Sequence, residues 1–218
     1  MNRSAVFVTL IGATLGSATL VPLRAPSGST TEKPVKHTAA TDRRRSRFPN
    51  VPLHTHENQE VRFYDDLLKD KTVLINFMYT ECQGGCPLTT TNLVRVQQAL
   101  GERVGRDLFM YSISVDPEHD TPAELRTYAT RFEVQPGWLF LTGAKANIAR
   151  LRASFGDNPG LEASQSNHLS VIRLGIEPLE RWAGCPTWST PKTIIRYLSW
   201  IEPNGQRPDG SNLRIMRD

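Results

Sequence analysis

The sequence predicts an α/β domain in which a central, mostly parallel sheet is flanked by helices. Strand-like apolar runs alternate with helix-like segments along residues 72–155, a short extra hairpin precedes them, and a strand pair and a helix follow. Alternation of this kind favours parallel strands with helices on both faces of the sheet. The apolar fraction of 39% and the charged fraction of 22% are those of an ordinary globular domain.

The first part of the domain contains a hairpin, a buried strand and a helix. Residues 51–53 and 60–63 are predicted to form the two short hairpin strands. Residues 72–79 are strongly apolar and β-branched at their start, which is typical of a central strand. Pro87 suits the first turn of a helix, and apolar side chains recur on one helical face as far as Gly101.

The second part repeats this alternation. We expect strands at 108–115 and 138–141, helices at 122–132 and 144–155, and a closing helix at 191–201. A late strand pair is predicted at 168–174 and 178–182, with a turn near Gly175. The thioredoxin fold and its relatives fit this order of elements.

Residues 1–23 have the plan of a secretory signal. Arg3 precedes an uncharged stretch at 4–23 that contains small residues suited to cleavage. The stretch is also close to the length that spans a bilayer, so a cleaved signal and a retained anchor remain alternatives. Both predict an exported domain. Residues 24–47 are predicted to be a flexible basic linker, 48–202 the folded domain and 203–218 a tail.

The net charge of +4 is concentrated outside the predicted domain. Residues 1–50 hold 8 basic and 2 acidic residues, which leaves 18 basic and 20 acidic residues for the rest of the chain. A folded nucleic-acid binder carries its basic surface on the domain itself. We therefore expect no nucleic-acid partner.

Two cysteines follow the first core strand. Cys82 and Cys86 are four residues apart, with Gly84 and Gly85 between them to allow a tight turn into the next helix. Free N–H groups and the dipole at a helix N-terminus stabilise a thiolate and lower the thiol pKa. Such thiols exchange disulfides readily and also bind soft metal ions.

Other roles for the pair are a plain disulfide or a zinc knuckle. A disulfide would close a very small loop, and the entropic stabilisation from such a bridge is small. A zinc knuckle requires a second ligand pair of similar spacing, which the chain lacks. The disulfide therefore stays open as an alternative, and the zinc knuckle does not.

Three segments in order resemble the Sco/SenC family of thioredoxin-like copper proteins. They are 73–82 with 85–87, 112–122, and 167–175. The resemblance extends from about residue 48 to 201, and it implies a thioredoxin-like fold and a role in assembling the copper centre of cytochrome c oxidase. It also implies copper ligation by Cys82, Cys86 and His168, with Asp116 as an acidic neighbour.

The chain departs from the family pattern at two positions. Gln83 stands where the family commonly has proline, and Asn167 where many members have aspartate. These changes would affect thiol pKa and copper affinity, but they leave the three ligand types intact. Two thiolates and an imidazole are a ligand set that suits copper.

The predicted function is a copper chaperone that works in the bacterial periplasm, anchored there if residues 4–23 are retained. It would pass copper to the copper-site subunit of cytochrome c oxidase, with other copper chaperones or thioredoxin-like reductants as further partners. This function needs no substrate turnover. The alternative is an enzyme, a thiol–disulfide oxidoreductase in which Cys82 and Cys86 keep oxidase cysteines reduced.

Four further residues are candidates for weaker roles. His54 and His56 would share one face of a strand and could bind a metal weakly, although exposed polar positions are favoured. His119 is expected to be a surface residue. Cys185 is the odd cysteine, and we expect it to be buried and inert rather than a resolving thiol or a ligand.

Overall fold

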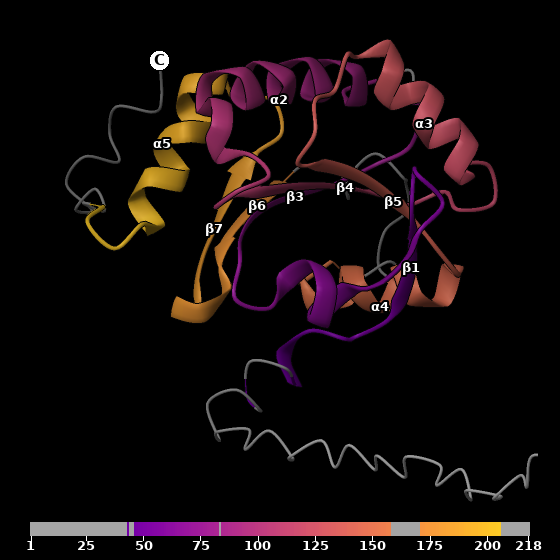
Figure 1. Ribbon diagram of the computed structural model, residues 1–218, viewed down its shortest axis with the longest axis horizontal. Coiled ribbons are helices and arrows are strands. Elements are labelled where there is room, and N and C mark those ends of the chain that lie inside the picture. Colours follow the sequence, from indigo (N-terminus) through magenta and orange to yellow (C-terminus); the bar gives the residue numbers. More distant parts are fainter. Residues whose placement is uncertain (1–42, 44–45, 83, 158–170, 206–218) are drawn as a thin grey trace, which may run out of the picture. The chain divides into compact units, whose positions relative to one another are not determined.

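The computed structural model describes residues 43, 46–82, 84–157 and 171–205. The chain divides into two units, Met1–Lys36 and His37–Asp218, and every described residue belongs to the second. This unit is built on a seven-stranded sheet in the order β2-β1-β5-β4-β3-β6-β7, with helices on both faces (Figure 1). The predicted α/β, thioredoxin-like architecture is therefore confirmed.

The strands pair in parallel only at the centre of the sheet. Strands β3, β4 and β5 are parallel neighbours, whereas all other neighbouring pairs are antiparallel. The sheet is thus mixed rather than mostly parallel as predicted, because the leading hairpin and the late strand pair add antiparallel strands to a parallel core. The strands are β1 Pro52–Thr55, β2 Glu60–Arg62, β3 Thr72–Met78, β4 Phe109–Ser114, β5 Trp138–Thr142, β6 Val171–Ile176 and β7 Arg181–Pro186.

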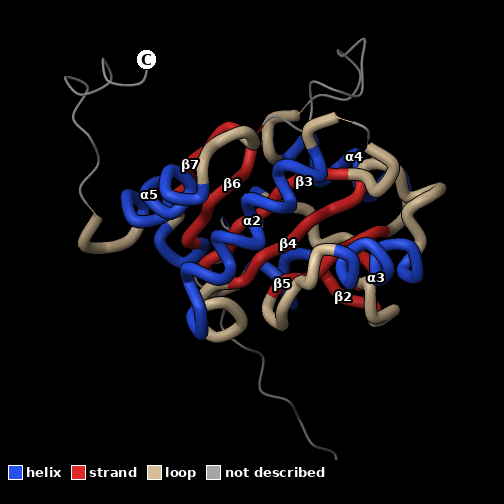
Figure 2. Tube along the Cα trace, turned by 90° about the horizontal axis from the view of Figure 1, so that it is seen from above, coloured by secondary structure: helices blue, strands red, loops and turns tan. Residues whose placement is uncertain are grey.

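Three of the four long helices cover one face of the sheet. They are α2 Cys86–Leu100, α3 Pro122–Arg131 and α5 Pro191–Ile201, while α4 Lys145–Ser154 lies on the opposite face (Figure 1). Figure 2 shows α2 running across the middle of the sheet between α5 and α3. The hydroxyls of Thr121 and Thr190 accept hydrogen bonds from the first turns of α3 and α5, which fixes where both helices begin.

Strand β3 separates two apolar cores. Leu74 and Met78 point into the core beneath α2, α3 and α5, and Val73, Ile75 and Phe77 point into the core against α4. This two-sided burial explains why the strand is nearly continuous in apolar residues rather than alternating. The exception is Asn76, a polar residue only 1% exposed.

The late strand pair differs from its prediction. Residues 177–180 form the turn, and β7 extends to Pro186, so the predicted strand 178–182 was placed too early. Gly175 lies inside β6, opposite Trp182. A Cβ at this glycine would lie only 2.3 Å from the Trp182 ring, so the glycine leaves space for the indole rather than making a turn. Residues 168–170 of the first predicted strand lie outside the described residues.

In the described part of the chain, no helix has both the length and the apolar character needed to cross a membrane. Residues 4–23, for which an anchor or a signal is predicted, lie outside that part.

Candidate metal centre

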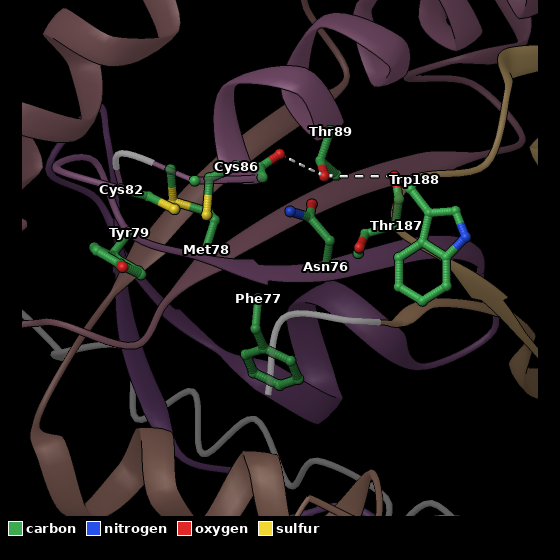
Figure 3. A pocket seen from close by; sticks show the side chains of 11 residues that line it. Asn76, Phe77, Met78, Tyr79, Cys82, Cys86, Thr89, Thr187 and Trp188 are labelled. Carbon is green, nitrogen blue, oxygen red and sulfur yellow. Dashed lines mark hydrogen bonds between the residues drawn. The ribbon is translucent and has the colours of Figure 1, made fainter. Parts of the chain in front are cut away.

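The two cysteines lie where β3 turns into α2. The strand ends at Met78, and the helix begins at Cys86, with proline directly after it. The Cys82 N–H donates to Tyr79 O at 3.4 Å, which closes the turn after the strand. Figure 3 shows the two sulfur atoms directed toward each other. All three cysteines of the chain are unbridged thiols in this structure.

The surroundings shift the pKa values of the two thiols in opposite directions. Burial alone would raise the pKa of Cys82, but hydrogen bonds from the Cys86 thiol, from the N–H groups of Cys86 and Gly84, and from the Tyr79 hydroxyl outweigh it and lower this pKa. Burial and the hydrogen bond to Cys82 raise the pKa of Cys86 to about 12. Cys82 is therefore the more acidic of the two thiols and loses its proton first as the pH rises.

A pocket of about 240 Å³ opens beside the sulfur atoms. Its walls come from the end of β3, the start of α2 and the loop between β7 and α5. The side chains around it are uncharged (Figure 3). The pocket is lined by Asn76, Phe77, Met78, Tyr79, Cys82, Gly84, Gly85, Cys86, Thr89, Thr187 and Trp188.

The buried side chain of Asp120 holds the cysteine turn in place through hydrogen bonds. Asp120 is 1% exposed and accepts hydrogen bonds from the N–H and hydroxyl of Thr80 and from the hydroxyl of Ser114. Thr80 is two residues before Cys82, so Asp120 ties the turn to the end of β4. Asp120 is not singled out by the sequence, because its role as a buried acceptor depends on contacts with Thr80 and Ser114.

Asp116 lies in the same loop and is partly exposed. Its N–H donates to the Ser114 hydroxyl, and its carboxylate pairs with Nδ1 of His119 at 2.9 Å. The pKa of Tyr79 is raised mainly by its hydrogen bond with Cys82 and by burial, and the charge of Asp116 makes a smaller contribution in the same direction. Asp116 is therefore within electrostatic reach of the site. His119 is exposed, as expected.

None of the remaining candidates lines the pocket, and some lie outside the described residues. Cys185 is fully buried in β7, and burial raises the pKa of its thiol. His56 lies beyond the end of β1, and its Nδ1 accepts from the Phe140 N–H, so the predicted same-strand histidine pair is wrong. His54 lies in β1. His168, Asn167 and Gln83 lie outside the described residues.

Within the described ranges, no three side chains of the His, Cys, Asp and Glu types are arranged to hold a metal ion. The cysteine pair thus offers at most two sulfur ligands within these ranges. The first residue described after the gap, Val171, is three residues beyond His168.

Comparison with known families and relatives agrees with the earlier resemblance. The sequence profile of the SCO1/SenC family matches residues 50–167. The SCO1 protein homolog of Bacillus subtilis is 34% identical over 96 residues, which are 43% of this chain and 49% of that protein. The chain thus spans about half the length of that relative. The SCO2-like protein of Rickettsia felis is 30% identical over 152 residues, 65% of this chain and 71% of that protein.

Solved structures give the same result. The copper-bound structure of Bradyrhizobium japonicum ScoI is 28% identical, covers 69% of this chain and 99% of its own, and has a TM-score of 0.54. BsSco, a Sco-family cytochrome c oxidase assembly protein with a disulfide switch, is 25% identical, covers 68% of this chain and 90% of its own, and has a TM-score of 0.55.

Proposed function

Because the chain belongs to the SCO1/SenC family, we propose that it is a copper-binding chaperone for cytochrome c oxidase assembly. Copper would be its cargo, held by Cys82, Cys86 and His168. The observation that carries this proposal is the pair of unbridged thiols at the N-terminus of α2, directed toward each other beside an open pocket. The copper-bound ScoI relative supports copper as the metal.

The donor set fits copper. Thiolates are soft ligands that favour copper, and an imidazole adds a third ligand of intermediate character. Cys82 is already biased toward the thiolate, whereas Cys86 has to lose a proton when it binds a metal. Binding at neutral pH therefore releases a proton, and copper affinity rises with pH.

The register of the sheet indicates where the chain emerges after the segment that contains His168. Strand β6 pairs antiparallel with β3, with Arg173 opposite Ile75. If this register continues for two residues, Val171 is in line with Phe77, near the carboxyl end of β3. Three residues of chain span at most about 10 Å. That reach supports His168 as the third ligand.

Redox state would control the binding. If Cys82 and Cys86 formed a disulfide, the two thiolates would be lost and copper could not be held. We therefore propose that the chain loads copper only in its reduced form, with a thioredoxin-like reductant or another copper chaperone as a partner upstream and the oxidase copper-site subunit downstream. Export, and a signal or anchor at residues 4–23, are part of this proposal.

A thiol–disulfide oxidoreductase is the second candidate. It is favoured by the opposite pKa shifts of the two thiols, because one thiol is then the better nucleophile. The Cys82 thiolate would attack a partner disulfide and form a mixed disulfide, and Cys86 would then displace the partner thiol. The partner gains two electrons, and the chain is left with a Cys82–Cys86 disulfide that an external dithiol has to reduce.

Copper titration of the reduced full chain tests the main proposal. We expect Cys82→Ser and Cys86→Ser to abolish tight binding, and His168→Ala to weaken it at least about tenfold. The matched controls are Cys185→Ala, which removes a buried thiol in β7, and His54→Ala, which removes a histidine in β1; both should bind as the wild type does. Unchanged affinity in His168→Ala would remove that residue from the ligand set. Fast disulfide turnover that does not depend on His168 would favour the oxidoreductase.

A further inference from the structure

Exposed apolar side chains are concentrated beside the cysteine turn. Among the described residues, the large apolar side chains with high exposure are Leu88 at 58%, Leu179 at 45% and Trp188 at 69%. Leu88 is two residues after Cys86, and Trp188 lines the pocket that contains both thiols. Leu179 lies in the turn at the opposite end of the β6–β7 pair.

The loop that carries Trp188 is fixed to α2. The Asn92 amide donates to Ser189 O at 3.3 Å. The Thr89 hydroxyl has its nearer acceptor in Gly85 O, at 3.0 Å, and shares its proton with Thr187 O at 3.4 Å. These contacts hold the residues on either side of Trp188. The backbone is thus fixed while the indole stays exposed. A partner that contacts the indole therefore loses little binding free energy to ordering of this loop.

A chain of hydrogen bonds directs the amide of Asn76 into the pocket. The indole N–H of Trp138 can only donate, and it donates to the Ser112 hydroxyl oxygen at 3.0 Å. The Ser112 hydroxyl therefore uses its proton on Asn76 Oδ1, at 2.7 Å. The Asn76 NH₂ group is left facing the pocket, and it has no hydrogen-bond partner in the described part of the chain. Although the residue as a whole is 1% exposed, an acceptor that enters the pocket can form a hydrogen bond with this amide.

The two ends of the pocket differ in chemistry. Figure 3 shows the sulfur atoms at one end and the Trp188 indole at the other, with Asn76 and Thr89 between them. Cys82 and Cys86 are 9% and 5% exposed, so a molecule that exchanges metal or sulfur with them has to approach over these walls. Because the lining side chains other than the two thiols carry no charge, an entering segment with charged side chains would lose hydration without compensation.

We propose that this pocket is the docking site for the acceptor: an uncharged, extended segment of a partner protein that carries a sulfur ligand next to an aromatic or aliphatic side chain. The partner sulfur meets the cysteine pair, a partner backbone carbonyl accepts from the Asn76 amide, and the apolar side chain packs on Trp188. This inference rests on the proposed function, because it describes how the same thiols would pass on their copper.

The test uses the copper-free reduced full chain and short peptide probes. Each probe is an uncharged peptide whose single cysteine is held as a thiopyridyl disulfide. A phenylalanine stands one, two or three residues from that cysteine, and in the matched probes glycine replaces the phenylalanine. The Cys82 thiolate attacks the peptide sulfur, a Cys82–peptide disulfide forms, the peptide–pyridyl bond breaks, and thiopyridone leaves with the electron pair and takes up a proton. Its absorbance gives the rate.

We expect the wild type to react fastest with one of the phenylalanine probes, and Trp188→Ala to lower that rate about tenfold, to the level of the glycine probe. The rate with hydroxyethyl disulfide, which is small and uncharged, reports the thiol alone, and each variant's peptide rates are divided by it. Leu179→Ala is the matched control and should change neither rate. Asn76→Asp keeps the acceptor for Ser112 but loses the donor, and it should slow all the peptide probes.

Three results would overturn the proposal. The first is equal rates for phenylalanine and glycine probes in the wild type. The second is an equal loss in Trp188→Ala and Leu179→Ala. The third is a wild-type chain that sediments as a dimer and a Trp188→Ala chain that sediments as a monomer, because the pocket would then hold a second copy. Copper titration stays independent of both, so the proposed function and this inference can fail separately.

Discussion

The cysteine pair shows how position within one turn separates two chemically identical groups. Cys82 accepts hydrogen bonds from backbone and side-chain donors, whereas Cys86 donates a hydrogen bond to Cys82 and is more deeply buried. Tyr79 takes part through its hydroxyl, and its own pKa is raised by the hydrogen bond with Cys82. The Cys82 sulfur therefore forms a thiolate more readily and is the better nucleophile or ligand, whereas the Cys86 sulfur stays protonated to higher pH.

The pH dependence of alkylation follows from this asymmetry. In the reduced chain we expect iodoacetamide at neutral pH to modify Cys82 first, with a rate that falls as pH drops through its lowered pKa. Cys86 should stay largely unmodified until the pH approaches about 12, because only the thiolate reacts. Mass spectrometry of tryptic peptides measures both. Tyr79→Phe removes one donor and should raise the pKa of Cys82, and equal rates at the two cysteines would contradict the assignment.

Asp120 is the second residue whose role is defined by its contacts. Replacing it by alanine would leave the hydroxyls of Thr80 and Ser114 and the Thr80 N–H without their buried acceptor. We expect Asp120→Ala to lower the free energy of unfolding by roughly 3 kcal/mol, measured by urea denaturation. Asp107→Ala is the control, because this exposed carboxylate pairs only with surface arginines and should change stability little. Equal losses in the two variants would show that Asp120 does not support the turn.

At the level of elements, the boundaries that local signals define were predicted well. The closing helix was expected at 191–201 and is found at Pro191–Ile201, because a threonine and a proline mark its start. The strand expected at 108–115 is found at Phe109–Ser114. The late hairpin was misplaced because glycine is a turn signal in sequence, whereas Gly175 is required by an indole that reaches it from the neighbouring strand.

The parts of the candidate site also differ in how far the sequence predicts them. The cysteine turn could be predicted because all of its parts are adjacent in the chain: a strand, two glycines, and a proline that starts a helix. Asn76 gave a signal as a polar residue inside an apolar run, but its donor is directed by Ser112 and Trp138, which belong to other strands. Trp188 comes from a distant loop. Only the tertiary fold brings these residues to one pocket.

Gly175→Ala tests the account of the late hairpin. A Cβ at this position would lie inside the contact distance of the Trp182 ring, so the indole or strand β6 has to move. We expect a loss of roughly 2 kcal/mol in the free energy of unfolding, typical of overpacking. Gly184→Ala on the neighbouring strand is the control, because its Cβ would lie 3.1 Å from a Val171 methyl group and should cost less. If Gly175→Ala were as stable as the wild type, the glycine would have no packing role.

For the folded unit as a whole, stability depends on two cores on opposite faces of one sheet. The core beneath α2, α3 and α5 contains all three cysteines, and the other core is formed by α4, the segment 63–68 and the chain that leads into β1. Phe48 belongs to that leading chain. Its ring lies 5.0 Å from the ring of Phe155 and 4.9 Å from that of Trp182, and it is 3% exposed.

The start of the folded domain can therefore be located by truncation. A chain that begins at residue 43 retains every apolar side chain of both cores, and we expect its urea midpoint and copper affinity to match those of the full chain. A chain that begins at residue 49 loses Phe48 and should unfold with about 3 kcal/mol less free energy, as for removal of a buried phenylalanine. Phe48→Ala in the full chain is the matched control and should give the same loss. If the shorter chain were as stable as the longer one, the domain would begin at β1, and the contacts of Phe48 would contribute nothing to the fold.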